Sequence, residues 1–167
     1  IKVVKIQVDN LNKIKNISAT KEQLNSLGFT GVHNDNIWRQ HNLELKAGSF
    51  IEQGDELLNL IKNYKIEGIN IREISFYSEI EEDADNYYVG TIDVYLLAIN
   101  KKNKTLLALD LTDDLSYCFD CAKDSSSFLD ALYYAMEYMI YKLTKVIERN
   151  ELNTNDYRTK CTIAAGG

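Results

Sequence analysis

The segment from Thr91 to Arg149 constrains the fold more than any other part of the chain. It reads as a strand, a turn rich in Lys and Asn, a second strand, an Asp-containing turn, a third strand and one long amphipathic helix. Short strands joined by tight turns pair antiparallel, and their apolar face needs a covering layer. The segment therefore predicts an α+β fold in which helices cover an antiparallel sheet.

The three strands of this segment are marked by the residue types of the turns between them. They are expected at Thr91–Ile99, Thr105–Leu111 and Tyr117–Ala122. Residues 100–104 and the pair Asp113-Asp114 form the turns, because Asn and Asp side chains bond the local backbone. Strand-like sequence already begins at Tyr87, and Gly90 interrupts it as a break or bulge. Together with earlier strands, this predicts a sheet of four to six strands.

The long helix is expected from about Ser126 to Arg149, with Asp124 and the following serines as N-caps. Its apolar residues recur at the three-and-four spacing of one helix face. They are Phe128, Leu132, Ala135, Met136, Met139, Leu143, Val146 and Ile147. This face should cover the sheet and bury Leu106, Leu109, Leu132, Met136, Met139 and Leu143. A last helical turn or two is expected from Asp156 to Ala165.

The elements before Thr91 are less regular, and all of them fit one domain over residues 1–167. They are a strand at Lys2–Val8, a short helix after Thr20 that Gly28 ends, a helix that Asp55 caps and that runs to Tyr64, and a strand from Ile69 to Phe76 with an irregularity near Glu73. The acidic run from Glu79 to Asp85 is expected to be a solvated loop. The chain opens on Ile1 rather than Met, so we expect the natural start to lie upstream.

Composition narrows the class of protein. The net charge of -6 repels phosphate, which argues against direct nucleic-acid binding and favours a basic partner. No apolar run reaches the roughly 18 residues that span a bilayer. Three cysteines are too few, and odd in number, for a secreted disulfide framework. We therefore expect a cytoplasmic protein, and the heavy use of Asn, Lys and Ile suggests a bacterial or phage genome.

The sequence contains a CxxC at Cys118 and Cys121, which we interpret as structural. The pair falls within a predicted strand, where its side chains point to opposite faces of the sheet. A redox pair would instead sit at a helix N-terminus. The remaining potential zinc ligands, Cys161, His33 and His41, show no paired spacing. We expect reduced cysteines, no metal and no cofactor.

Two other groups of residues are candidates for catalysis. His33 and His41 flank Trp38 in a segment without periodicity, where structural or surface histidines are more common than acid–base pairs. Asp110, Asp113 and Asp114 follow a strand, as metal-binding carboxylates do, yet they also fit ordinary turn positions. No nucleophile turn of the GxSxG type is present. We expect no catalytic residue.

The candidate partner-binding residues are carboxylates and aromatic side chains. Five carboxylates within seven residues would steer a basic partner and raise its association rate. They are Glu79, Glu81, Glu82, Asp83 and Asp85. Aromatic rings are frequent at protein interfaces. The aromatic candidates are Tyr87, Tyr88, Trp38, Tyr134 and Tyr138.

With this order of segments, residues 69–135 resemble the SUKH superfamily. The resemblance is carried by Ile71-Arg72-Glu73-Ile74-Ser75-Phe76-Tyr77, by Tyr88-Val89-Gly90, by Leu106-Leu107-Ala108-Leu109-Asp110-Leu111 and by Ala122-Lys123-Asp124-Ser125-Ser126-Ser127-Phe128-Leu129. It implies a strand, a glycine-marked strand, a strand ending in Asp, another strand and then a helix. Because bacterial members are mostly immunity proteins, it also implies binding and neutralisation of a toxin.

The leading functional hypothesis is a non-enzymatic cytoplasmic protein that neutralises a protein partner, as a toxin-immunity protein does. One alternative is a phage-encoded acidic inhibitor of a host defence enzyme, which would array carboxylates at phosphate-like spacing. Another is a small metal-dependent hydrolase that uses Asp110, Asp113 and Asp114, which would need to converge in one pocket.

Overall fold

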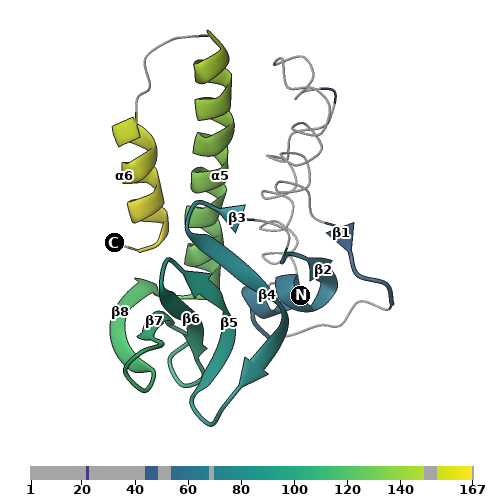
Figure 1. The fold of residues 1–167 in the computed structure, drawn as a ribbon, viewed down its shortest axis with the longest axis vertical. Coiled ribbons are helices and arrows are strands. Elements are labelled where there is room, and N and C mark those ends of the chain that lie inside the picture. The colour runs from purple at the N-terminus through teal and green to yellow at the C-terminus, as the bar shows by residue number, and fades with distance from the viewer. Residues whose placement is uncertain (1–21, 23–43, 49–53, 68–69, 149–153, 167) are drawn as a thin grey trace.

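The computed structural model describes residues 22, 44–48, 54–67, 70–148 and 154–166 (Figure 1). The expected strand Lys2–Val8 lies outside the described residues. So does the short N-terminal helix, apart from Glu22. Trp38, His33 and His41 also lie outside them, so the predictions made for these three side chains are not addressed by the structure.

The described part of the chain folds as α+β, as predicted, around a six-stranded antiparallel sheet. Every strand pairs with its neighbour in sequence, which gives the spatial order β3-β4-β5-β6-β7-β8. The edge strand β3 is only two residues long. The strands are β3 (Asn70–Ile71), β4 (Ile74–Glu82), β5 (Asn86–Ile92), β6 (Tyr95–Asn100), β7 (Leu106–Asp110) and β8 (Ser116–Ala122). The expected hairpin loop at 100–104 and the Asp113-Asp114 turn are confirmed.

Three details of the predicted strands are wrong. The expected strand Thr91–Ile99 contains a turn at Asp93-Val94 and belongs to two antiparallel strands. The irregularity expected near Glu73 is likewise a hairpin turn, at residues 72–73. The run from Glu79 to Asp85 is not a loop, since its first four residues belong to β4. Asp93 and Arg72 take left-handed backbone conformations, with φ of 54° and 55°, and so close both turns without glycine.

Gly90 forms the expected bulge, because the pairing of β5 with β6 shifts register between Tyr88 and Gly90. A Cβ atom at Gly90 would lie 2.1 Å from the backbone oxygen of Ser75 on β4. Only glycine allows this approach of the two strands. The β4–β5 pair is also irregular between Phe76 and Glu81. Such irregularities bend a sheet and increase its twist.

The helices are α4 (Glu56–Asn63), α5 (Ser125–Glu148) and α6 (Thr154–Ala164). In Figure 1, α5 rises from the sheet and α6 lies alongside it. The long helix expected from about Ser126 is α5, and the helical segment expected from Asp156 to Ala165 is α6. Two short strands, β1 (Glu44–Leu45) and β2 (Tyr64–Lys65), form a separate sheet that the sequence did not predict. Among the described residues, no helix is long and apolar enough to cross a membrane.

The main core lies between the sheet and the helices. Leu57, Leu60 and Ile61 of α4 pack there together with strand residues and with α5. The expected burial of Leu106, Leu109, Leu132 and Met136 is confirmed. Leu109, however, lies in a second cluster outside this core. The side chains of Met139 and Leu143 are outside the described part of the chain.

A buried carboxylate joins the first turns of α4 and α5. Asp55 Oδ1 accepts hydrogen bonds from the backbone N–H groups of Leu57 and Leu58, at 3.0 and 3.1 Å, which confirms it as the N-cap of α4. The hydroxyl of Ser125 donates to both oxygens of the same carboxylate, at 2.7 and 2.8 Å. Ser125 is the first residue of α5 and is 1% exposed. One side chain therefore fixes the relative position of two helices that are distant in sequence.

Asp55→Ala is expected to destabilise the protein by about 2 to 4 kcal/mol, because it removes a cap and leaves the Ser125 hydroxyl buried without its partner. Urea unfolding followed by circular dichroism measures the change. Asp124→Ala is the matched control. It removes only the α5 cap, in which Asp124 Oδ1 accepts from the Ser127 N–H at 2.7 Å, and should cost about 1 kcal/mol. Equal costs for the two variants would show that the Asp55–Ser125 contact adds nothing.

Candidate functional site

The two faces of the six-stranded sheet differ in what covers them. One face carries the main core, to which α4 and α5 contribute side chains. The other carries a smaller buried cluster of Leu96, Ala98 and Leu109, against which the partly buried Tyr77, Tyr88 and Leu107 pack. In the part of the chain that the structure describes, no helix contributes to this second cluster. We call this second side the open face.

A groove with a volume of about 550 Å³ lies on the open face. Its lining comes from β4, β5, β6 and the turn between β7 and β8. The lining residues are Tyr77, Ser78, Glu79, Glu81, Tyr88, Leu96, Leu111 and Leu115. Leu111 and Leu115 are 53% and 38% exposed, although both are large and apolar. We call this site the open-face groove.

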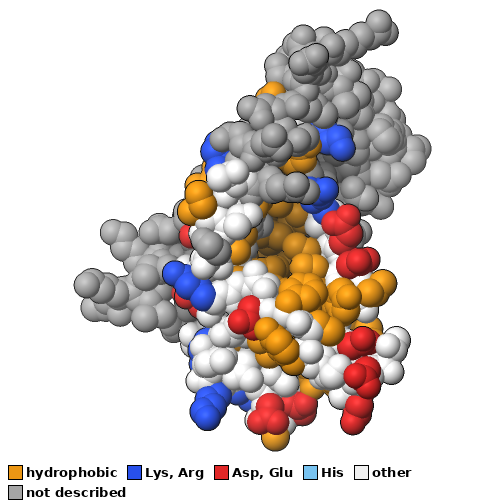
Figure 2. All heavy atoms as spheres, turned by 90° about the vertical axis from the view of Figure 1, so that its left-hand side faces the viewer, with side chains coloured by type: hydrophobic (Ala, Val, Ile, Leu, Met, Phe, Trp, Pro, Cys, Tyr) orange, Lys and Arg blue, Asp and Glu red, His pale blue; other side chains and the backbone are white. Residues whose placement is uncertain are grey.

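Hydrophobic side chains are also exposed beside the groove. Tyr117 pairs with Leu109 across β7 and β8 and is 62% exposed. Figure 2 shows the side of the molecule that carries β8 and α6, and there hydrophobic side chains gather between rows of Asp and Glu. Exposed apolar surface with a charged border is typical of an interaction site.

The predicted acidic run is divided between the two faces of the sheet. Glu81 is the cross-strand partner of Tyr88, and both line the open-face groove. Glu82 is the partner of Tyr87, which packs against the main core on the other face. This division follows from the two-residue period of a strand. Of the predicted set, the structure therefore brings together Glu79, Glu81 and Tyr88, and it separates them from Glu82 and Tyr87.

Asp83 and Asp85 belong to the turn that joins β4 to β5. Asp83 Oδ1 accepts hydrogen bonds from the backbone N–H groups of Asp85 and Asn86, at 2.8 and 2.7 Å. Its other oxygen accepts from the hydroxyl of Tyr88. The hydrogen bond from Tyr88, and then those from the backbone, lower the pKa of the Asp83 carboxyl below its ordinary value. Asp83 therefore fixes this turn and the ring of Tyr88 at the edge of the groove.

Tyr88→Phe is expected to raise the pKa of Asp83 toward its ordinary value near 3.8, because the largest cause of its lowering is lost. In the wild type, the stabilisation from Asp83 is present above the unfolded-state pKa and is lost as the pH falls through the lower folded-state pKa. A carbon-13 NMR titration of the Asp83 side-chain carboxyl measures its pKa in the folded wild type and in the folded variant. Tyr77→Phe is the control and should leave the titration of Asp83 unchanged. An unchanged pKa in Tyr88→Phe would contradict this role for the hydroxyl.

The predicted contact residues on α5 lie away from the groove. Tyr134 lines a separate pocket of about 460 Å³ between α5 and α6. Its ring stacks edge-on against that of Tyr133, with 5.2 Å between centroids. Tyr138, one helical turn further along α5, does not line the open-face groove either. The structure thus does not join these two tyrosines to the acidic residues in one surface.

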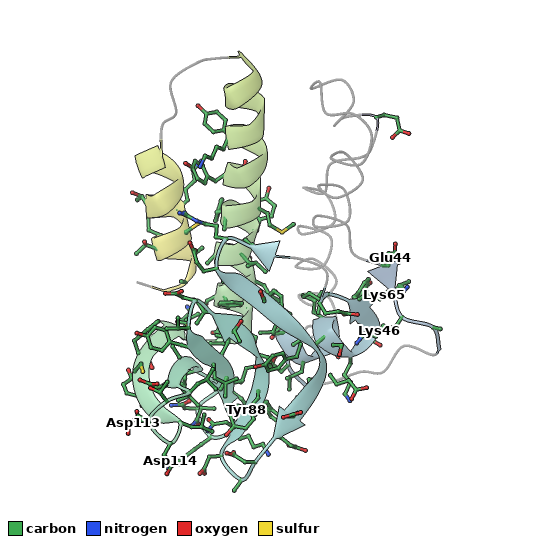
Figure 3. All side chains as sticks on the ribbon, in the orientation of Figure 1. Glu44, Lys46, Lys65, Tyr88, Asp113 and Asp114 are labelled. Carbon is green, nitrogen blue, oxygen red and sulfur yellow. The ribbon has the colours of Figure 1, made fainter. Side chains whose placement is uncertain are left out.

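Asp110, Asp113 and Asp114 behave as turn residues. Asp110 Oδ1 accepts from the N–H and the hydroxyl of Thr112, both at 2.7 Å, and Asp113 Oδ2 accepts from the Ser116 hydroxyl at 3.0 Å. Figure 3 places Asp113 and Asp114 at the outer end of the sheet. Among the described residues, no group of three or more His, Cys, Asp or Glu side chains could hold a metal ion. This geometry gives the metal-dependent hydrolase no support.

The CxxC cysteines lie on β8, as predicted. Cys121 packs against the main core, and burial, followed by the charge of Asp120, raises the pKa of its thiol to about 11. Cys118 occupies a bulge, since the pairing of β7 with β8 skips it, and its thiol lies 3.8 Å from the backbone oxygen of Ser116. Both thiols are free, as is that of Cys161. A raised pKa makes Cys121 a poor nucleophile.

Cys121 is expected to react with iodoacetamide at pH 8 about a hundredfold more slowly than a thiol of ordinary pKa, because only the thiolate attacks. Mass spectrometry of the alkylated peptide gives the rate. Replacing both Cys118 and Cys121 with Ala should cost about 1 to 3 kcal/mol in packing. Fast alkylation of Cys121, or stoichiometric zinc in the purified protein, would contradict a structural role.

Sequence reasoning missed five lining residues, Tyr77, Ser78, Leu96, Leu111 and Leu115. Leu111 and Leu115 flank the Asp113-Asp114 turn, and large apolar residues beside a turn were the available signal for an exposed patch. Tyr77 alternates with Glu79 and Glu81, so extending β4 through the acidic run would have put all three on one face.

The comparisons with known proteins identify no relative. No family model, curated protein or solved structure matches the chain. The resemblance of residues 69–135 to the SUKH superfamily therefore stays a prediction. The assignment of function starts from the open-face groove and its chemistry.

Proposed function

We propose that this chain is a non-enzymatic binding protein that neutralises a basic protein partner in the cytoplasm, and that the partner is a toxin. The observation that carries the proposal is the open-face groove, in which two exposed leucines and two partly buried tyrosines lie beside carboxylates. The resemblance to the SUKH superfamily supports the same function.

The chemistry of the groove favours a protein partner. Leu111 and Leu115 expose apolar surface that a partner would remove from water. Tyr77 and Tyr88 supply rigid rings with polar tips, which are enriched in protein interfaces. The carboxylates and the net charge of -6 attract a basic surface and repel an acidic one.

The same features weigh against the two alternatives. An inhibitor that mimics nucleic acid would repeat carboxylates without apolar interruption. In the groove, by contrast, Glu79 and Glu81 stand beside tyrosine and leucine side chains. A hydrolase would bring Asp110 and Asp113 into one pocket, whereas each accepts a hydrogen bond from a nearby residue at the β7–β8 turn.

The double variant Glu79→Lys/Glu81→Lys tests the proposal with the product of the gene immediately upstream, the expected toxin. Because charge steers the encounter, we expect the upstream product to associate with the immobilised double variant about tenfold or more slowly than with the immobilised wild type. The association rate with the variant should also lose most of its dependence on salt. Biolayer interferometry at several salt concentrations measures both. Co-expression of the wild-type chain should also restore growth to cells that make the toxin.

Glu67→Lys is the matched control. Glu67 is exposed and does not line the groove. Its replacement by Lys changes the net charge in the same direction as the double variant does. It should change the association rate by less than about twofold. An upstream product that neither binds the wild-type chain nor inhibits growth would contradict the proposed function.

A further inference from the structure

We propose that the open-face groove binds an arginine side chain of the partner, with the guanidinium between the Glu81 carboxylate and the rings of Tyr77 and Tyr88. The inference rests on the proposed function and specifies its chemistry: the partner presents an arginine on an apolar segment.

The chain itself shows what a Glu–Tyr pair across β4 and β5 binds. On the helix-covered side of the sheet, Glu82 and Tyr87 are cross-strand partners. The ammonium group of Lys101 lies 4.7 Å from the centre of the Tyr87 ring and 2.7 Å from Glu82 Oε2. A cation thus sits over the ring and against the carboxylate at once, which is the geometry of a cation–π contact joined to an ion pair.

The neighbouring pair repeats this arrangement on the open face. Glu81 and Tyr88 are cross-strand partners one residue further along, so their side chains lie on the opposite side of the sheet. Glu79 and Tyr77 line the same groove. Among the described residues, no ion pair involves Glu79 or Glu81. The open-face pair thus lacks, in this part of the chain, the counterpart of Lys101.

Among the described residues, no Lys or Arg side chain lines the open-face groove. Lys101 is held on the other side by Glu82. Lys65 pairs with Glu44 at 3.1 Å. Lys46 donates to the backbone oxygens of Ile61 and Ser78, at 2.7 and 2.5 Å, and forms no ion pair with a carboxylate of the groove. Figure 3 shows Glu44, Lys46 and Lys65 together at the small sheet, on the opposite side of the molecule from Asp113 and Asp114.

Arginine fits the groove better than lysine does. Its planar guanidinium stacks on aromatic faces, is more weakly hydrated than an ammonium, and can reach two carboxylates through its fork of donors. Glu79 and Glu81 supply two carboxylates, and Tyr77 and Tyr88 supply two rings. The leucines of the groove offer apolar surface to the three-carbon stem.

Three acetylated and amidated pentapeptides test the inference, each with valine and threonine around a central arginine, lysine or citrulline. Citrulline has the shape of arginine but no charge. Titration of the nitrogen-15-labelled chain, followed by NMR, should show shifts for residues 77–81 and for Tyr88 with the arginine peptide. Its Kd should be at least about tenfold lower than that of the citrulline peptide, with lysine between the two.

The double variant Glu79→Gln/Glu81→Gln keeps the shape of the groove and both rings, and should reduce the difference between the arginine and citrulline peptides to about twofold or threefold. Glu67→Gln is the control and should keep the tenfold difference. Equal binding of the two peptides to the wild type, or shifts confined to α5 and α6, would overturn the inference.

Binding of the upstream product to the wild type and to the double variant distinguishes a failure of the proposed function from a failure of arginine recognition. If the upstream product binds the chain but binds Glu79→Gln/Glu81→Gln equally well, the neutralising function stands and arginine recognition in the groove is wrong. If the arginine peptide is selected and the upstream product does not bind, the groove chemistry stands and the proposed toxin is wrong.

Discussion

The hydrogen bonds of the buried Asp55 carboxylate join the two helices that pack on one face of the sheet. The same carboxylate caps α4 and accepts from the hydroxyl of Ser125, the first residue of α5. Side chains of both helices pack in the core on the same face of the sheet. A sheet in this class of fold commonly buries one face and leaves the other to solvent. Here the other face keeps apolar side chains, including Leu111 and Leu115, at its surface. Among the described residues, the helices that Asp55 joins contribute to the core on one face, and no helix contributes to the cluster on the other.

The two-residue period of β4 and β5 then gives each face its own chemistry. Glu82 and Tyr87 hold Lys101 within the molecule, whereas Glu81 and Tyr88 face the open-face groove. One pair stabilises the fold internally, and the other is placed to meet a cation from outside. The turn that Asp83 closes fixes both pairs, because it sets the register of the two strands and holds the Tyr88 hydroxyl. The internal contact and the proposed binding site thus use neighbouring positions of a single hairpin.

Local sequence chemistry predicted the α+β class, the Asp55 cap, the Gly90 bulge and strands β7 and β8, because each depends on a residue type or a short apolar period. It missed the Asp93-Val94 turn. Val94 favours strands, and nothing in its own chemistry shows that the chain reverses there with Asp93 at positive φ. The high charge of Glu79–Asp85 predicted a loop, although residues up to Glu82 belong to β4. The two-residue period of a strand, which puts Glu81 and Glu82 on opposite faces, was therefore not expected there. Whether a leucine is core or surface depends on which face the helices cover, and that is set by contacts distant in sequence.

Hydrogen–deuterium exchange of the chain in complex with the product of the gene upstream tests most directly the central claim that the open face is the binding surface. The claim predicts slower exchange at the amides of residues 77–81 and 111–115 and at Tyr88, with little change along α5 and α6. Protection confined to the α5–α6 surface around Tyr133 and Tyr134, with the open-face groove exchanging as in the free protein, would contradict it.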